Sequence, residues 1–134
     1  MSQQTTINVD FTEEQPIVEA LKEMGFAVEV HPTGKTLSTY YSLGKHNAPT
    51  ANIIIKQGQR NINYADIGFQ KMKDGKYILH GDDMDIRKLN QDRLKQLYTK
   101  HFIKQRLQLF GSQYAIAEEV INGNNIKIKI KVSE

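Results

Sequence analysis

The feature that most constrains this chain is the strict alternation of residues 125–132. Aliphatic side chains occupy every second position, and lysines occupy the positions between them: Ile126, Lys127, Ile128, Lys129, Ile130, Lys131 and Val132. Because successive side chains of a β-strand point to opposite faces, this pattern predicts a strand with one face in a core and the other in water. Residues 122–124 form a predicted turn that joins it to a strand at 114–120, so we expect a hairpin here.

A strand–helix–strand unit is predicted near the beginning of the sequence. Residues 5–10 alternate, and residues 27–31 read as a second strand. Between them, apolar side chains recur at helical spacing, namely Ile17, Val18, Leu21 and Met24. Asp10 or Thr12 is expected to cap this helix, and Gly25 is expected to end it.

Residues 51–80 predict a three-stranded antiparallel meander. Its strands are expected at 51–56, 62–72 and 77–80. The Asp-Gly pair at 74–75 is a strong hairpin signal, because glycine tolerates the positive φ that tight turns need. Gly68 lies inside the middle strand, where it predicts a bulge or a close backbone approach.

Residues 32–50 are the least regular stretch and predict a surface loop suited to binding. The Gly-Lys-Thr at 34–36 is no phosphate-binding loop, because position 29 is Glu and no helix is expected to follow. Tyr40, Tyr41 and His46 lie in this stretch and are candidates for stacking on a ligand.

A long helix is predicted from about residue 86 or 90 to residue 110. One broad apolar side holds Leu94, Leu97, Tyr98, His101, Phe102 and Leu109, and another holds Ile103, Leu107 and Phe110. A helix that is apolar on two sides is either deeply covered at one end or forms a partner site. Gly111 is expected to end it.

Together these segments predict an α+β fold in a single domain over residues 1–134. We expect a mainly antiparallel sheet of about seven strands with two helices on one face, in the order βαβ-βββ-αββ. The absence of Cys from the sequence excludes disulfides and thiolate metal sites. No signal peptide or membrane span is predicted, so we expect a soluble cytoplasmic protein.

Charge is distributed unevenly along the chain. The net charge is +3, but residues 86–134 hold ten basic and four acidic side chains, whereas residues 1–85 hold eight and eleven. Arg93, Lys100 and Lys104 are expected to form a basic stripe on the long helix. Such a stripe is either an edge that tracks phosphates or acidic proteins, or a solvated face that pairs with the acidic half.

The segment His80-Gly81-Asp82-Asp83-Met84-Asp85 raises the possibility of a divalent metal or of acid–base chemistry. Its spacing matches neither a calcium loop nor a catalytic zinc site. Asp83 or Asp85 would equally serve as a helix N-cap. We favour the capped turn and expect no metal, no other cofactor and no enzymatic activity.

Several short motifs follow one another in an order typical of one known family. They are residues 6–7, 20–25 (Ala-Leu-Lys-Glu-Met-Gly), 51–56 (Ala-Asn-Ile-Ile-Ile-Lys), Tyr64, 66–69 (Asp-Ile-Gly-Phe), 74–77 (Asp-Gly-Lys-Tyr), 97–98, Gly111, 118–120, Gly123 and Ile126. In these the chain resembles a family of small proteins of unknown function found in cyanobacteria, other bacteria and phages. The family is typified by the chloroplast hypothetical reading frame thirty-five protein (domain of unknown function twelve fifty-seven). Its genes sometimes lie beside those of MoxR-type ATPases, so the resemblance implies an adaptor or a substrate role and carries no established activity.

Two functions are therefore expected. The first is a non-enzymatic interaction module, an adaptor or small regulator or inhibitor that binds a larger protein, such as an ATPase or a nucleoprotein complex. The alternative is a nucleic-acid-binding protein that uses the basic helix and the lysine strand. The candidate binding residues are Tyr40, Tyr41, His46, Arg93, Lys100, Lys104, Lys127, Lys129 and Lys131.

Overall fold

A computed structural model describes residues 4–38, 48–110, 114–122 and 125–132. In chain order the elements are β1 (Gln4–Asn8), α1 (Glu14–Glu23), β2 (Glu29–Thr36), β3 (Thr50–Ile55), β4 (Ile67–Lys71), β5 (Tyr77–Asp82), α2 (Asp83–Lys88), α3 (Gln91–Phe110), β6 (Tyr114–Asn122) and β7 (Asn125–Val132). The expected α+β class with antiparallel strands is confirmed, as is the meander of β3, β4 and β5.

The strands form two sheets rather than the single sheet of about seven strands expected from the sequence. Five strands pair in the order β1-β5-β4-β3-β2, and in the described part of the chain β6 pairs with β7 alone. The described residues form three helices in place of the expected two, since the short helix α2 follows β5 directly. A period-two pattern requires that the apolar face of the strand be covered, but it does not say whether a sheet or a helix covers it. Here the β6–β7 hairpin packs against α3.

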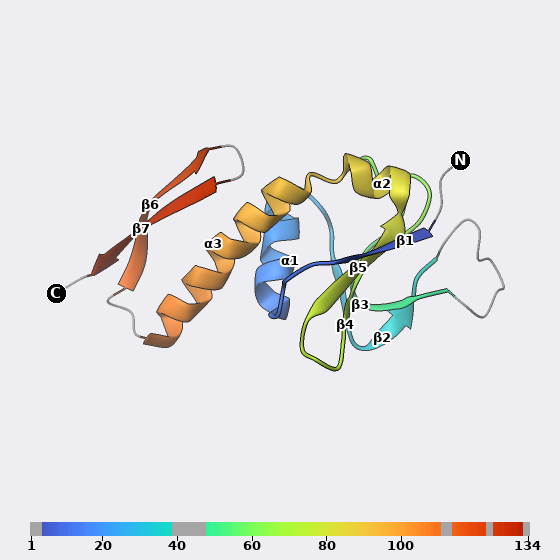
Figure 1. Ribbon diagram of the computed structural model, residues 1–134, viewed down its shortest axis with the longest axis horizontal. Helices are drawn as coiled ribbons and strands as arrows, with labels where there is room; N and C mark the ends of the chain where they lie inside the picture. The colour runs from blue at the N-terminus through green and yellow to red at the C-terminus, as the bar shows by residue number, and fades with distance from the viewer. Residues whose placement is uncertain (1–3, 39–47, 111–113, 123–124, 133–134) are drawn as a thin grey trace.

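The main core lies between the five-stranded sheet and helices α1 and α3 (Figure 1). Alternate residues of the strands, such as Ile53, Phe69 and Leu79, are fully buried against both helices. Ile17 and Leu21 of α1, and Leu94 and Leu97 of α3, complete this core. The spacing of the buried residues follows from the period of each element. Side chains two apart in a strand share a face, and those three or four apart share one side of a helix.

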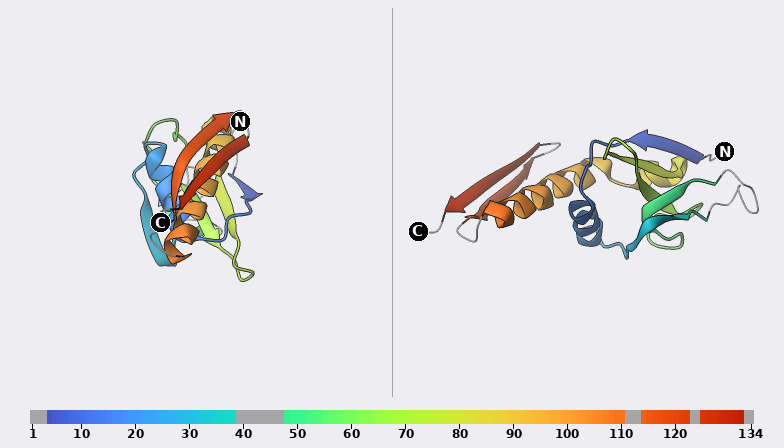
Figure 2. Two further views of the ribbon diagram at one scale, coloured as in Figure 1. Left: turned by 90° about the vertical axis from the view of Figure 1, so that its left-hand side faces the viewer. Right: turned by 90° about the horizontal axis from the view of Figure 1, so that it is seen from below.

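Helix α3 continues past the sheet, and the hairpin lies beside its C-terminal half (Figures 1 and 2). The N-terminal half of α3 is buried on the core side, whereas Ile103 and Leu107 are half-buried further along. Leu109, expected on the broad apolar side, is 71% exposed. The two-sided apolar pattern thus reflects a helix placed between α1 on one side and the hairpin on the other.

Two predicted strand boundaries are wrong, the end of β2 and the beginning of β4. Strand β2 continues through Pro32 and Gly34 to Thr36, although its pairing with β3 shifts between Val30 and Lys35. Strand β4 begins only at Ile67, because the preceding residues are held in turns by side-chain hydrogen bonds. Tyr40, Tyr41 and His46 lie outside the described residues, so their expected role remains a prediction.

The ends of α1 are also held differently from expectation. Neither Asp10 nor Thr12 caps it; instead the Tyr98 hydroxyl accepts hydrogen bonds from the backbone N–H groups of Thr12 and Glu13, at 3.0 and 3.2 Å. Gly25 does end the helix, with φ +96° and its N–H bonded to the Lys22 carbonyl. This geometry needs glycine, because other residues are strained at positive φ.

Gly68 confirms the expected close approach and gives a test of the packing. A Cβ at this position would lie 2.5 Å from the Ala51 Cβ and 2.8 Å from the Leu37 Cδ2. Gly68→Ala should therefore lower the free energy of unfolding by about 1–3 kcal/mol, measured by urea denaturation.

The double variant Gly68→Ala/Ala51→Gly removes the closest of these contacts. We expect it to lose less stability than the sum of the two single variants. Full additivity would show that the clash between residues 51 and 68 is not what disfavours a side chain at position 68.

Candidate interaction surfaces

Within the predicted basic stripe on α3, Lys100 pairs with an acidic residue at the end of α1, and Arg106, outside the stripe, pairs with one that precedes α1. Lys100 is 11% exposed, and its Nζ lies 2.6 Å from Glu23 Oε1. The Arg106 guanidinium lies 2.9 Å from Glu13 Oε1 and 4.8 Å from the centre of the Phe102 ring. These contacts connect α3 to the acidic region around α1 within one molecule, so Lys100 pairs with the acidic half of the chain and is largely covered.

The charges around Glu23 also show that basic residues of α3 pair with this acid of α1. Burial works to raise the pKa of Glu23, but the hydrogen bond from Lys100 and the charges of Lys100, His101 and Arg93 outweigh it and hold that pKa below its ordinary value. Arg93 is half-buried. Of the three residues of the predicted stripe, Lys104 alone is exposed.

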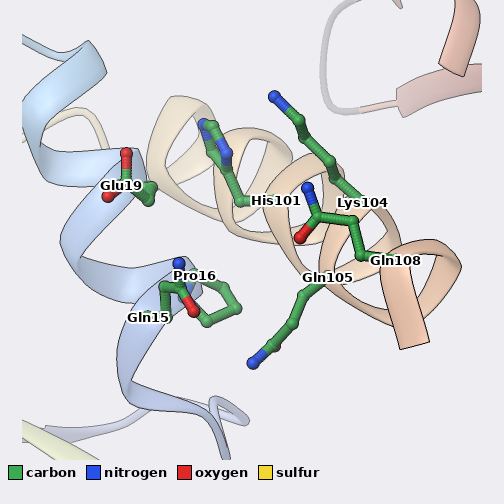
Figure 3. A pocket seen from close by; sticks show the side chains of 7 residues that line it. All are labelled: Gln15, Pro16, Glu19, His101, Lys104, Gln105 and Gln108. Carbon is green, nitrogen blue, oxygen red and sulfur yellow. The ribbon is translucent and has the colours of Figure 1, made fainter. Parts of the chain in front are cut away.

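Lys104 borders a shallow polar groove between α1 and α3, with a volume of about 260 Å³ (Figure 3). The groove is lined by Gln15, Pro16, Glu19, His101, Lys104, Gln105 and Gln108. Figure 3 shows that the Lys104 and Gln105 side chains point away from each other. The groove therefore presents three amides, one carboxylate, one ammonium group and one imidazole.

Lys127, Lys129 and Lys131 occupy alternate positions of β7, and Lys129 is exposed. The hairpin packs along α3, so the lysine strand lies near the C-terminal half of the helix and away from the five-stranded sheet (Figure 2). Arg93, near the beginning of α3, is not part of this region.

His80 is a buried structural residue of the sheet. Its Nδ1 lies 2.9 Å from Thr6 Oγ1, and its Nε2 lies 2.8 Å from Gln70 Oε1. The Gln70 amide in turn donates to Thr50 Oγ1 at 3.3 Å. Both imidazole nitrogens are thus used in a polar ladder across β1, β5, β4 and β3, which fits a neutral ring that accepts at Nδ1 and donates at Nε2.

The buried carboxylates that follow His80, Asp82 and Asp85, also accept hydrogen bonds within the fold, although Oδ2 of Asp82 is buried without a hydrogen-bond partner in the described ranges. Asp82, rather than Asp83 or Asp85, caps α2 by accepting from the N–H groups of Met84 and Asp85. Asp85 is 1% exposed and accepts from the N–H groups of Asn63, Tyr64 and Ala65 at 2.9–3.2 Å. Among the described residues, no cluster of three His, Asp or Glu side chains is arranged to hold a metal ion.

Asp66 is a third buried carboxylate, after Asp82 and Asp85, and its role was not predicted from the sequence. It accepts from the N–H groups of Ser38 and Gln57 and from Lys56 Nζ, at 2.8–3.0 Å. Together Asp66 and Asp85 hold the connection between β3 and β4. The sequence held one indication of this role, because both acids stand next to apolar residues. An acid whose neighbours are buried usually accepts hydrogen bonds within the fold.

The two edges of the five-stranded sheet differ in how they are protected. The β2 edge contains Pro32, the charged residues Glu29 and Lys35, and an irregular register. The β1 edge, Gln4–Asn8, contains no charge and no proline, and it pairs with β5 without a break from Gln4–Asp82 to Asn8–Ile78. Proline, charge and bulges are the usual means of blocking an edge strand, so β1 is the unprotected edge.

Comparison with known proteins gave no match to a family model, to a curated protein or to a solved structure. None of the helices in the described ranges is long and apolar enough to cross a membrane.

Removing the Asp85 carboxylate should destabilise the fold strongly. Asp85→Ala leaves three backbone N–H groups without their acceptor, and we expect the free energy of unfolding to fall by about 3 kcal/mol. Asp10→Ala, at an exposed position, is the matched control and should change it by less than about 0.5 kcal/mol. Equal effects of the two substitutions in urea denaturation would contradict the role assigned to Asp85.

The buried His80 should make stability depend on pH. Burial lowers the pKa of its imidazole in the folded chain below the ordinary value near 6.5. The unfolded chain therefore takes up a proton first, and the free energy of unfolding should decrease as the pH falls from about 7 through 6.5 until the folded ring is also protonated.

His101, whose pKa is also lowered mainly by burial, adds to this dependence in the same direction. His80→Gln should make the slope of stability against pH shallower while leaving the His101 contribution in place. An unchanged slope in His80→Gln would show that the His80 imidazole is not held neutral by the fold.

Proposed function

We propose that this chain is a non-enzymatic protein-interaction module, an adaptor or small regulator that binds an extended segment of a larger protein. The observation that supports this most is the unprotected edge of β1. Backbone N–H and C=O groups along such an edge can pair with an added strand, which gives affinity largely independent of side chains.

The β1 strand is well suited to this because it is held rigidly. It pairs with β5 along its whole length, and the Thr6 hydroxyl is bonded to His80 in the next strand. A strand that is already ordered loses little conformational entropy when a partner pairs with it, so less of the interaction energy is offset.

The buried ionisable groups support a non-enzymatic role. His80, Asp66 and Asp85 direct their polar atoms to partners within the fold, and Asp82 caps a helix. Acid–base catalysis needs such groups to face a substrate. In the described part of the chain they serve the framework instead.

Capture experiments with the full tagged chain test the proposal. Thr6→Lys/Asn8→Lys places two charges on the β1 edge at exposed positions. Thr33→Lys/Thr36→Lys makes the same change at exposed positions of the β2 edge and is the matched control. Thr6→Val separately measures the loss of the hydrogen bond to His80.

We expect the unmodified chain to capture a stoichiometric protein from cells of its source, with and without nuclease treatment. The β1 double variant should lose that partner, while the β2 control and Thr6→Val should retain it. Partners that disappear after nuclease treatment, together with capture that weakens steeply with salt, would instead support the nucleic-acid alternative through Lys104 and the β7 lysines.

A further inference from the structure

The outer edge of β1 is complementary to itself. Two copies of this five-residue strand can run antiparallel with Thr6 facing Thr6. Gln4 of each copy then faces Asn8 of the other, and Thr5 faces Ile7. Each facing pair joins residues of similar character, namely two threonines, two carboxamides or two β-branched side chains, and none contains a charge. Moving one strand by two residues leaves only three of the five positions paired, so the strand favours this register.

The symmetry that this register requires fits the architecture. A two-fold axis perpendicular to the sheet brings the two β1 strands together antiparallel. It joins the two five-stranded sheets into one continuous sheet and leaves helices α1 and α3 of both copies on the same face. The right-hand view of Figure 2 shows β1 at the outer boundary of the sheet, with no described element beyond it in that view.

On the side of the sheet that faces the helices, the pairing covers surface that a single chain leaves partly exposed. Ile7 is half-buried and packs against the main core, and Thr5 is also half-buried. In the paired form Ile7 of each copy contacts Thr5 of the other. β-branched side chains suit such a half-buried, pleated surface, and removing the rest of Ile7 from water stabilises the pair.

On the opposite side of the sheet, the facing side chains are polar. Asn8 is exposed, and its carboxamide makes no hydrogen bond within the described part of the chain. The Oε1 atom of Gln4 is buried and lacks a hydrogen-bond partner among the described residues. An unpaired buried acceptor is unfavourable, and a facing Asn8 carboxamide carries the donor that Gln4 lacks.

We propose that β1 pairs with β1 of a second copy of this chain, with Thr6 opposite Thr6, and that this homodimer covers the β1 edge until a partner segment displaces the second copy. Because the strand has five residues, the interface is small, and we expect a dissociation constant on the order of 0.1 mM. The free chain is then the monomer, whose β1 edge is open. The self-pairing stands by itself, whereas its control of access to β1 rests on the proposed function.

Sedimentation equilibrium of the full chain alone, from about 10 µM to about 1 mM, tests the self-pairing. We expect the average mass to rise from that of one chain towards that of two. Thr36→Lys, at an exposed position of the β2 edge, is the control and should dimerise as the unmodified chain does. A chain that stays monomeric throughout would overturn the inference.

Opposite charges at position 6 test the register. Thr6→Lys and Thr6→Glu each place like charges opposite one another across the two-fold axis, so each variant alone should stay monomeric. An equimolar mixture of the two places lysine opposite glutamate and should recover the dimer. Thr6→Val loses the hydrogen bond to His80 without adding a charge, and it should still dimerise. A mixture that stays monomeric, or a dimer of Thr6→Lys alone, would overturn the register.

A covalent dimer tests the control of partner access. The chain contains no Cys, so Thr6→Cys introduces a single thiol. Facing residues of antiparallel strands have Cα atoms about 4.5–5.5 Å apart, which a disulfide can span. Oxidised glutathione should therefore link Thr6→Cys into a dimer and leave the control Thr36→Cys unlinked.

The linked dimer should fail to capture the partner, and reduction should restore capture. Equal capture by the linked and the reduced forms would overturn the control of access. These outcomes separate the two proposals. Capture by a chain that never dimerises would remove only the self-pairing, whereas a dimer that captures no partner in either form would remove the proposed function and leave the self-pairing in place.

Discussion

The contact on which this molecule most depends is the stack of Phe11 on Tyr98, whose ring centres lie 4.0 Å apart. Phe11 also stacks on Phe69 of β4, and its carbonyl accepts the N–H of Tyr77 in β5. The Tyr98 hydroxyl, meanwhile, takes the two backbone N–H groups before α1. One aromatic pair, worth about 1 kcal/mol beyond its buried area, thus links the sheet, the start of α1 and the middle of α3.

This linkage fixes the direction in which α3 leaves the core, and with it the position of the hairpin (Figure 1). The ion pairs Lys100–Glu23 and Arg106–Glu13 add to it from the surface, joining the basic half of the chain to the acidic half. The excess positive charge of residues 86–134 is therefore partly matched within the molecule. Lys104 remains exposed beside the groove, and among the described strands the outer edge of β1 is not paired.

Much of the fold could be predicted because its periodicities are local. Gly25 and the Asp-Gly turn at 74–75 behave as expected, and Gly68 marks a close approach. The separation of β6 and β7 from the main sheet could not be predicted, since alternation fixes the faces of a strand but not its neighbours. Asp66 and Asp85 were also missed as framework residues, because their partners are backbone N–H groups up to 28 residues away. The unprotected β1 edge could not be predicted either, because the sequence does not show which strands pair with one another.

Amide hydrogen exchange along β1, followed by NMR, tests the central claim most directly. In an antiparallel edge strand, alternate N–H groups point to the neighbouring strand and the others point outward. We predict that between Gln4 and Asn8 every second amide exchanges slowly in the free chain, while the others exchange at nearly the rate of an unfolded peptide. Slow exchange of all these amides in the free chain would show that the β1 edge is already covered and would contradict the account.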